Sequence, residues 1–142
     1  KISNLLFSIK DHKPLAIIDW DTIMPGPILY DFADMIRSSC NRVEEDVVAT
    51  HIFNFEVYEA IKNGFVEGAA EILSYQEIEL LEFSCKTIIY IQAIRFLTDF
   101  LNHNIYYTCH YKLQNLNRTK NQIQLYDELN TYLKSTGTVV AK

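Results

Sequence analysis

Acidic side chains follow a short apolar stretch near the start of this 142-residue chain. The stretch 15–18 leads directly into Asp19 and Asp21, and a Pro-Gly-Pro turn separates these acids from Asp31 and Asp34. An apolar run rich in isoleucine and bounded by turn residues is typical of a buried strand. A strand that ends in carboxylates holds them in a fixed place, and Mg²⁺ binds one or two carboxylates together with phosphate oxygens. The pattern therefore predicts a magnesium site at the end of this strand.

A second candidate site lies in the apolar segment 88–101, which is expected to form a buried helix because it is apolar almost all round. Gln92, Arg95 and Asp99 fall on one face of that helix. Two alternatives are open for this polar stripe. Arg95 and Asp99, at i and i+4, can form a structural ion pair. Alternatively, the stripe lines a cleft, where the planar guanidinium can donate several fixed hydrogen bonds to sugar hydroxyls or phosphate.

The segment around Asp19 resembles the metal-binding region of the aminoglycoside phosphotransferase and choline kinase superfamily, and most closely its N-acetylhexosamine 1-kinase branch. In these kinases a loop reading His-any-Asp, four residues, then Asn supplies the catalytic base and one metal ligand. Residues 1–7 are similar to the tail of that loop. The resemblance implies that Asn4 and Asp19 are ligands of Mg²⁺ and that Lys1 faces the phosphates. Residues 95–101 also look like a signature of this branch.

The resemblance implies an ATP-dependent transfer of phosphate to a small sugar acceptor, an N-acetylhexosamine, with Mg²⁺ as cofactor. It favours the cleft alternative, in which Arg95 and Asp99 orient the sugar. Asp21 would join a second metal ion or cap the following turn. Asp31 and Asp34 are expected to stabilise a helix start, where acids are favourable. In the wider superfamily an acid of this segment braces the catalytic loop, which is the alternative for Asp31.

One element of the resemblance is missing from residues 1–142. The catalytic aspartate would lie two positions before Lys1, and the nucleotide-binding lobe would precede it. We therefore expect a single domain, the C-terminal lobe of a protein-kinase-like fold, that lacks its own base and is inactive alone. Two alternatives are a non-catalytic kinase-like binding module and a protein of the kind labelled a mucin-desulfating sulfatase. The chain has no Cys/Ser-any-Pro-any-Arg motif for a sulfatase nucleophile.

Composition narrows the possible partners. The content of 49% hydrophobic and 22% charged residues is ordinary for a globular protein. A net charge of −5 with scattered basic residues argues against a nucleic-acid surface. Three cysteines without metal-type spacing predict reduced thiols and a cytoplasmic protein. Polar residues interrupt the longest apolar run, 87–100, so no membrane span is expected.

The elements that would position these residues are mostly helical, which predicts a mostly α (α+β) fold with a short hairpin and a helical bundle. The hairpin is expected from 2–9 and 15–20, because Asp-His-Lys-Pro between them favours a turn. Ser74 and Glu77 have the spacing of a capping box, and the helix that they begin could break near 83–84. Helices are predicted at 30–40, 43–63 (ended by Asn63-Gly64), 65–73, 75–101 and 116–133, with a loop at 102–104 and a frayed tail from 135.

Overall fold

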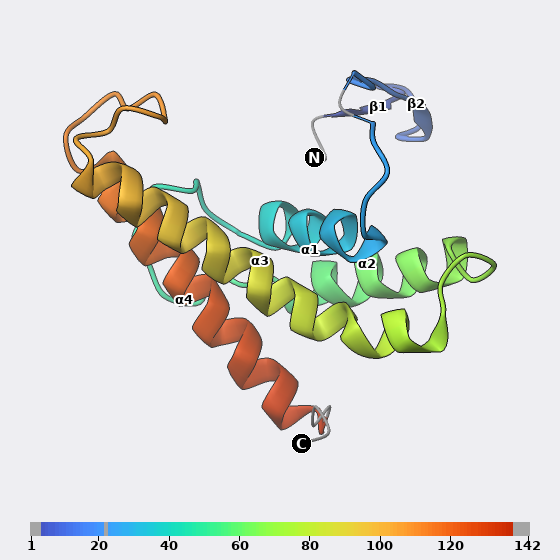
Figure 1. Cartoon of the computed structure of the whole chain (residues 1–142). Helices are drawn as coiled ribbons and strands as arrows, with labels where there is room; N and C mark the ends of the chain where they lie inside the picture. Colours follow the sequence, from blue (N-terminus) through green and yellow to red (C-terminus); the bar gives the residue numbers. More distant parts are fainter. Residues whose placement is uncertain (1–3, 22, 138–142) are drawn as a thin grey trace.

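The computed structural model describes residues 4–21 and 23–137. It confirms the predicted fold class, a two-stranded hairpin followed by helices (Figure 1). The elements are β1 (Leu5–Phe7), β2 (Pro14–Ile17), α1 (Ile28–Ser39), α2 (Phe55–Gly68), α3 (Tyr75–Leu101) and α4 (Gln114–Ser135). In the described part of the chain, no helix combines the length and the apolar content that crossing a bilayer requires.

The hairpin confirms the predicted strand pairing, although its strands are shorter than expected. Leu5 pairs with Ile17 in antiparallel register, and the Ile18 amide continues the ladder with a 2.9 Å hydrogen bond to the Asn4 carbonyl. The prediction that β2 is buried is wrong, because Leu15 and Ile17 are 68% and 55% exposed. Figure 1 shows the reason: the hairpin stands above the helices on an extended segment that leads into α1.

The core lies where α3 packs against α4 on one side and α1 on the other. Its fully buried side chains include Phe32, Ile36, Tyr58, Leu81, Ile89, Leu125 and Leu129. The last helix buries Leu125, Leu129 and Leu133, whereas Ile123 is 38% exposed. This helix begins at Gln114 and ends at Ser135, two residues beyond each predicted end.

Helix α3 is one unbroken helix of 27 residues. The predicted capping box is present, because the Ser74 hydroxyl accepts from the Glu77 amide at 3.3 Å and the Glu77 carboxylate accepts from the Ser74 amide at 2.8 Å. The predicted break near 83–84 is absent, since Ser84 donates to the Leu81 carbonyl without interrupting the helix. The expectation of burial all round is also wrong, because one side of α3 is exposed along its length.

The helix predicted at 43–63 begins only at Phe55, so residues 43–54, more than half of the predicted helix, form a loop. Tertiary contacts hold this loop in place and outweigh helix propensity. The Glu128 carboxylate accepts the amides of His51 and Phe53 at 2.6 and 2.8 Å. The buried Asn121 amide donates to the Val47 carbonyl at 2.8 Å.

The predicted stop at Asn63-Gly64 is wrong as well, because α2 continues to Gly68. The Asn54 side chain caps its start by accepting from the Val57 amide. A glycine within a helix is destabilising by only about 1 kcal/mol, so the packing of α2 can override it. The short helix expected at 65–73 is therefore the end of α2 followed by a turn.

Candidate functional site

Asn4 and Asp19 are brought together by the register of the hairpin. Asn4 immediately precedes β1, and Asp19 lies two residues after β2. Because the strands are antiparallel, these two ends meet, and Asn4 Nδ2 donates to Asp19 Oδ2 at 2.9 Å. The two predicted metal ligands therefore lie within direct contact of each other, although 15 residues separate them in the chain.

The backbone at Asp19 adopts a conformation that few residues favour. Its φ is +68°, in the left-handed region, which only glycine enters without penalty, although Asp and Asn visit it more readily than most residues. The next side chain stabilises this turn, because Trp20 Nε1 donates back to the Ile17 carbonyl at 2.5 Å. Backbone strain of this kind concentrates at functional sites.

The pair opens onto a cavity of about 520 Å³ between the hairpin and the helices. Asp31 and Asp34 contribute from α1, so three of the four predicted acids share this cavity. Its lining residues are Asn4, Leu5, Ile17, Ile18, Asp19, Trp20, Ile23, Asp31, Asp34, Met35, Ser39 and Ile61. Asp21 is exposed in the turn that follows and lies outside this lining.

The two acids of α1 differ in their surroundings. Asp31 lies in the first turn of the helix, as predicted, where a carboxylate suits the helix dipole. Asp34 lies one turn later and accepts from Arg37 Nε at 2.7 Å, and Arg37 also donates to Glu45 at 2.7 Å. Burial lowers the pKa of Arg37, but attraction to both carboxylates outweighs burial and raises that pKa overall. Arg37 thus stays charged and partly neutralises this wall of the cavity.

The donor set of the cavity fits Mg²⁺ better than a closed metal centre. It offers an amide and carboxylates, which are hard oxygen ligands. Among the residues that the structure describes, no three His, Cys, Asp or Glu side chains are grouped closely enough to hold a metal alone. Mg²⁺ commonly takes one or two protein carboxylates and completes its coordination with water and phosphate oxygens. Asn4 and Asp19 would be its protein ligands here.

A second polar cluster lies at the end of α3. The Arg95 side chain is exposed, and its guanidinium lies over the rings of Tyr106 and Tyr107, 5.9 and 5.7 Å from their centroids. Its Nη1 donates to Gln92 Oε1 at 3.4 Å, and Gln92 donates in turn to the Tyr107 hydroxyl at 3.2 Å. Cation–π contacts hold the guanidinium in place while leaving it open to solvent.

Asp99 is buried beneath this cluster and has a different set of partners. Its carboxylate accepts the amides of Tyr106 and Tyr107 at 2.7 and 3.0 Å and the Asn115 side chain at 2.7 Å. Burial tends to raise the pKa of Asp99, but these donors outweigh it and lower that pKa overall. No ion pair joins Arg95 to Asp99 within the described residues, so the pairing alternative fails.

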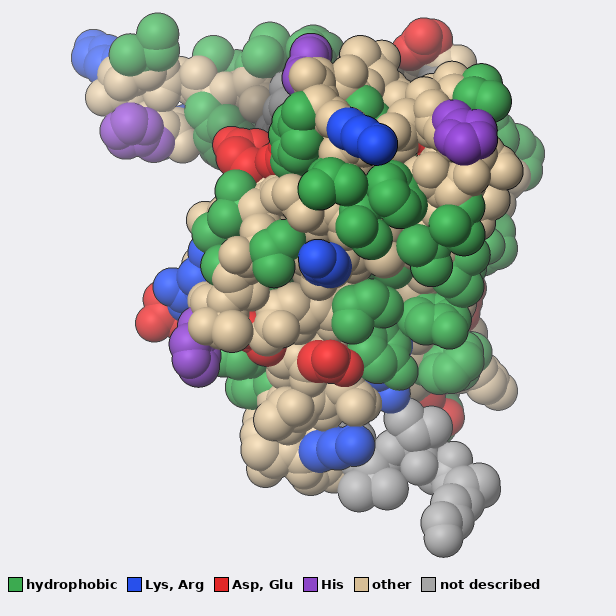
Figure 2. Space-filling model, turned by 90° about the vertical axis from the view of Figure 1, so that its left-hand side faces the viewer, with side chains coloured by type: hydrophobic (Ala, Val, Ile, Leu, Met, Phe, Trp, Pro, Cys, Tyr) green, Lys and Arg blue, Asp and Glu red, His purple; other side chains and the backbone are tan. Residues whose placement is uncertain are grey.

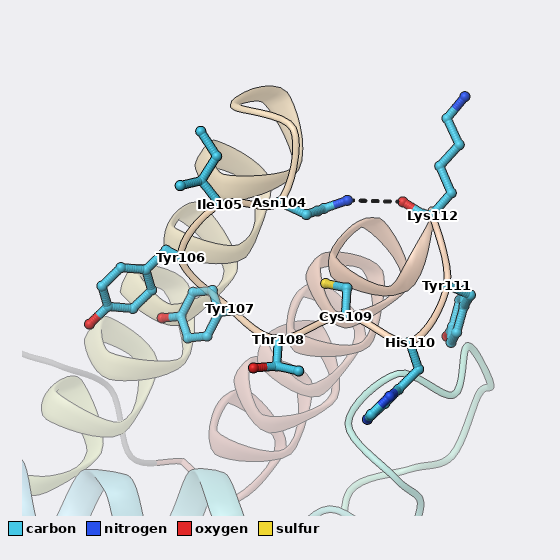
Figure 3. Close-up of a pocket in the computed structure, with 9 residues that line it drawn as sticks. All are labelled: Asn104, Ile105, Tyr106, Tyr107, Thr108, Cys109, His110, Tyr111 and Lys112. Carbon is cyan, nitrogen blue, oxygen red and sulfur yellow. Dashed lines mark hydrogen bonds between the residues drawn. The ribbon is translucent and has the colours of Figure 1, made fainter.

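Tyr106 and Tyr107 belong to the loop between α3 and α4, and several hydrogen bonds fix the conformation of this loop (Figure 3). Asn104 donates across the base of the loop to the Lys112 carbonyl at 3.2 Å, and Arg118 reaches the Thr108 carbonyl at 3.4 Å. The loop surrounds an open pocket of about 410 Å³. Figure 1 shows this loop and the hairpin on the same side of the molecule, well separated from each other.

Sequence reasoning did not single out every residue of these two clusters. Nothing in the local sequence pattern of Tyr106 and Tyr107 links them to Arg95. A positive φ at Asp19 also has no sequence signal of its own. Lys1, predicted to face the phosphates, lies outside the described residues.

A comparison with known protein families finds a match over the part of the chain that contains the first cluster. Residues 1–62 match a family described as the Phosphotransferase enzyme family. The matched region contains the hairpin, the Asn4–Asp19 pair and α1 with Asp31 and Asp34. The match covers less than half of the chain, and it supports a resemblance of residues 1–62 to the aminoglycoside phosphotransferase and choline kinase superfamily.

Proposed function

We propose that this chain is the C-terminal lobe of an ATP-dependent sugar phosphotransferase. The observation that carries the proposal is the contact between Asn4 and Asp19 at the mouth of a cavity lined by two further acids. The family match covers this cavity and supports the same chemistry. An upstream catalytic aspartate and a nucleotide-binding lobe would complete the enzyme, so residues 1–142 alone are expected to be inactive.

The metal ligands would be Asn4 and Asp19. Bound Mg²⁺ would neutralise charge on the phosphates and help to position them for in-line transfer. The contact from Asn4 Nδ2 to Asp19 Oδ2 orients both groups before any metal arrives. Asp21, which is exposed beside this pair, remains the candidate for a second ion, and Lys1 remains the candidate for a phosphate contact.

We propose an N-acetylhexosamine as the acceptor, and Arg95 remains the candidate for a contact with it. Transfer also requires the acceptor hydroxyl to reach the phosphate beside Asn4 and Asp19, from which the loop that follows α3 is well separated (Figure 1). Arg95 has five N–H donors in a planar fork, more than Gln92 can occupy, and the rings of Tyr106 and Tyr107 fix its plane. Asp99 would act on the acceptor through the two tyrosine amides that it binds. It is therefore a positioning residue in this proposal.

The test uses a longer polypeptide that joins residues 1–142 to a nucleotide-binding lobe. Transfer of labelled γ-phosphate from ATP to N-acetylhexosamine should be lost in Asp19→Asn, because the amide removes one charge from the metal site at nearly unchanged volume. Asp11→Asn is the matched control, since Asp11 lies in the exposed hairpin turn. Arg95→Lys should raise KM for the sugar well beyond KM for ATP.

Three outcomes would contradict the proposal. Turnover that survives Asp19→Asn would show that Asp19 is only a turn residue. Phosphate transfer to choline in place of the sugar would show that the proposed N-acetylhexosamine acceptor is wrong. No transfer to any acceptor by the longer polypeptide, with bound nucleotide still detectable, would favour a non-catalytic kinase-like binding module.

A further inference from the structure

Helix α3 carries an exposed seam on the side that faces away from the core. Its members alternate at spacings of three and four residues through the helix, which is the repeat of a coiled-coil interface. They are Leu80, Phe83, Thr87, Tyr90, Ile94, Leu97 and Leu101, which we call the α3 seam. A regular repeat of this kind is typical of a helix that packs against one other helix along its length.

The α3 seam carries no charge, and all of its members except Thr87, which is polar and half-buried, are exposed apolar side chains. Its aromatic members Phe83 and Tyr90 are 52% and 51% exposed, and Leu101 is 66% exposed. Of the charged residues between Leu80 and Leu101, Glu82 and Asp99 are buried on the core side. Lys86 and Arg95 lie at the margins and outside the repeat. Figure 2 shows hydrophobic side chains gathered from the centre to the right-hand side of the face that it draws.

The α3 seam is complementary to a second copy of itself in antiparallel orientation. With a two-fold axis between Tyr90 and Ile94, the alternating spacing of one helix matches that of the other from Phe83 to Leu101, whereas Leu80 falls opposite position 104, beyond the end of α3. Phe83 then faces the partner's Leu101, Thr87 faces the partner's Leu97, and Tyr90 faces the partner's Ile94. Each of these contacts occurs twice, once from each copy, as an isologous interface requires.

The available area is sufficient for such an interface. Counting about 200 Å² for each aromatic side chain and somewhat less for each aliphatic one, the exposed fractions along the seam leave at most on the order of 600 Å² on one copy. Two copies would bury about 1,200 Å² in total, the lower end of the range for specific interfaces. A contact of this size predicts a reversible dimer that depends on protein concentration.

We infer that α3 pairs with α3 of a second copy, forming an antiparallel homodimer along the α3 seam. The inference does not depend on the proposed phosphotransferase activity, because the α3 seam includes neither Arg95 nor the Asn4–Asp19 pair. Covering the seam would also remove from water the apolar side of α3 that the core leaves exposed.

The first experiment is sedimentation equilibrium of the 142-residue chain from micromolar to millimolar concentration. A monomer–dimer equilibrium is expected. Ile94→Asp should raise its dissociation constant at least about tenfold, because it buries a carboxylate in the interface. Ile72→Asp is the matched control and should leave the constant unchanged, since Ile72 is 74% exposed in the turn before α3. Circular dichroism checks that both variants fold.

The second experiment tests the orientation with cysteine pairs in a Cys109→Ser background. Mixed copies of Tyr90→Cys and Ile94→Cys should form a disulfide-linked dimer on mild oxidation. Mixed copies of Tyr90→Cys and Leu80→Cys should not, since those positions lie on the order of 20 Å apart along the pair. The inference would be overturned if the chain stayed monomeric at every concentration or if Ile94→Asp left the dimer unaffected. It would also be overturned if Tyr90→Cys formed a disulfide only with Tyr90→Cys of another copy.

Discussion

Arg37 links the wall of the cavity to the loop after α1, and its replacement by methionine gives a quantitative test. The guanidinium is nearly buried and makes two 2.7 Å hydrogen bonds, to Asp34 and to Glu45. Met retains much of the apolar stem, so the change mainly removes the charged head. Hydrogen bonds to charged groups contribute about 1.5–3 kcal/mol each at most.

The expected loss of unfolding free energy in Arg37→Met is smaller than the summed contributions of two such hydrogen bonds. The carboxylates left behind are 44% and 38% exposed in Asp34 and Glu45, so water can solvate both. The 3–5 kcal/mol that follows when a buried charge loses its partner therefore does not apply. We expect Arg37→Met to lower the free energy of unfolding by about 2 kcal/mol.

The measurement is urea denaturation of the chain followed by circular dichroism. The midpoint should fall while the m-value stays constant, since the native surface hardly changes. Arg42→Met is a matched control at an exposed arginine, whose bonds to Phe53 and Asn54 are 3.4 and 3.3 Å long. A change within about 0.5 kcal/mol for Arg37→Met, the usual range for surface substitutions, would refute this account of the cavity wall.

Three further predictions concern the elements around the two clusters. Ser74→Ala should lower the free energy of unfolding by about 1 kcal/mol through loss of the capping box, and an unchanged urea midpoint would contradict it. Glu128→Gln should increase amide exchange at His51 and Phe53, whose N–H groups the carboxylate binds; unaltered exchange would show that the loop is held otherwise. Asp99→Asn should weaken the dependence of stability on pH in acid: the folded-state pKa of Asp99 is lowered, so its stabilisation is present above the ordinary carboxylate pKa and is lost as pH falls through the folded value. If the free energy of unfolding depended on pH in the same way for the wild type and Asp99→Asn in acid, this prediction would be contradicted.

The sequence predicted the elements whose signals are local. The hairpin, the capping box at Ser74 and the long helices all depend on short-range patterns, and all are present. The contact of Asn4 with Asp19 is also local in this sense, since a two-stranded hairpin brings its own ends together.

The errors occur where distant residues decide the structure. The loop before α2 is held by Glu128 and Asn121 of α4, about 75 residues away in the chain, and no local pattern encodes those contacts. The partners of Asp99 are likewise supplied by the loop after α3 and by Asn115. Periodicity correctly placed Arg95 and Asp99 on neighbouring positions of a helix, but it could not show that one is exposed and the other buried.

The most direct test of the central proposal is the position of a bound divalent cation. Mn²⁺ added with ATP to the isotopically labelled chain broadens the NMR signals of nearby nuclei and needs no catalytic turnover. We predict selective broadening at the Asn4 side-chain amide and at Asp19, its loss in Asp19→Asn, and its retention in Asp11→Asn. Broadening centred on other residues, or equal broadening in Asp19→Asn, would contradict a metal site at the Asn4–Asp19 pair.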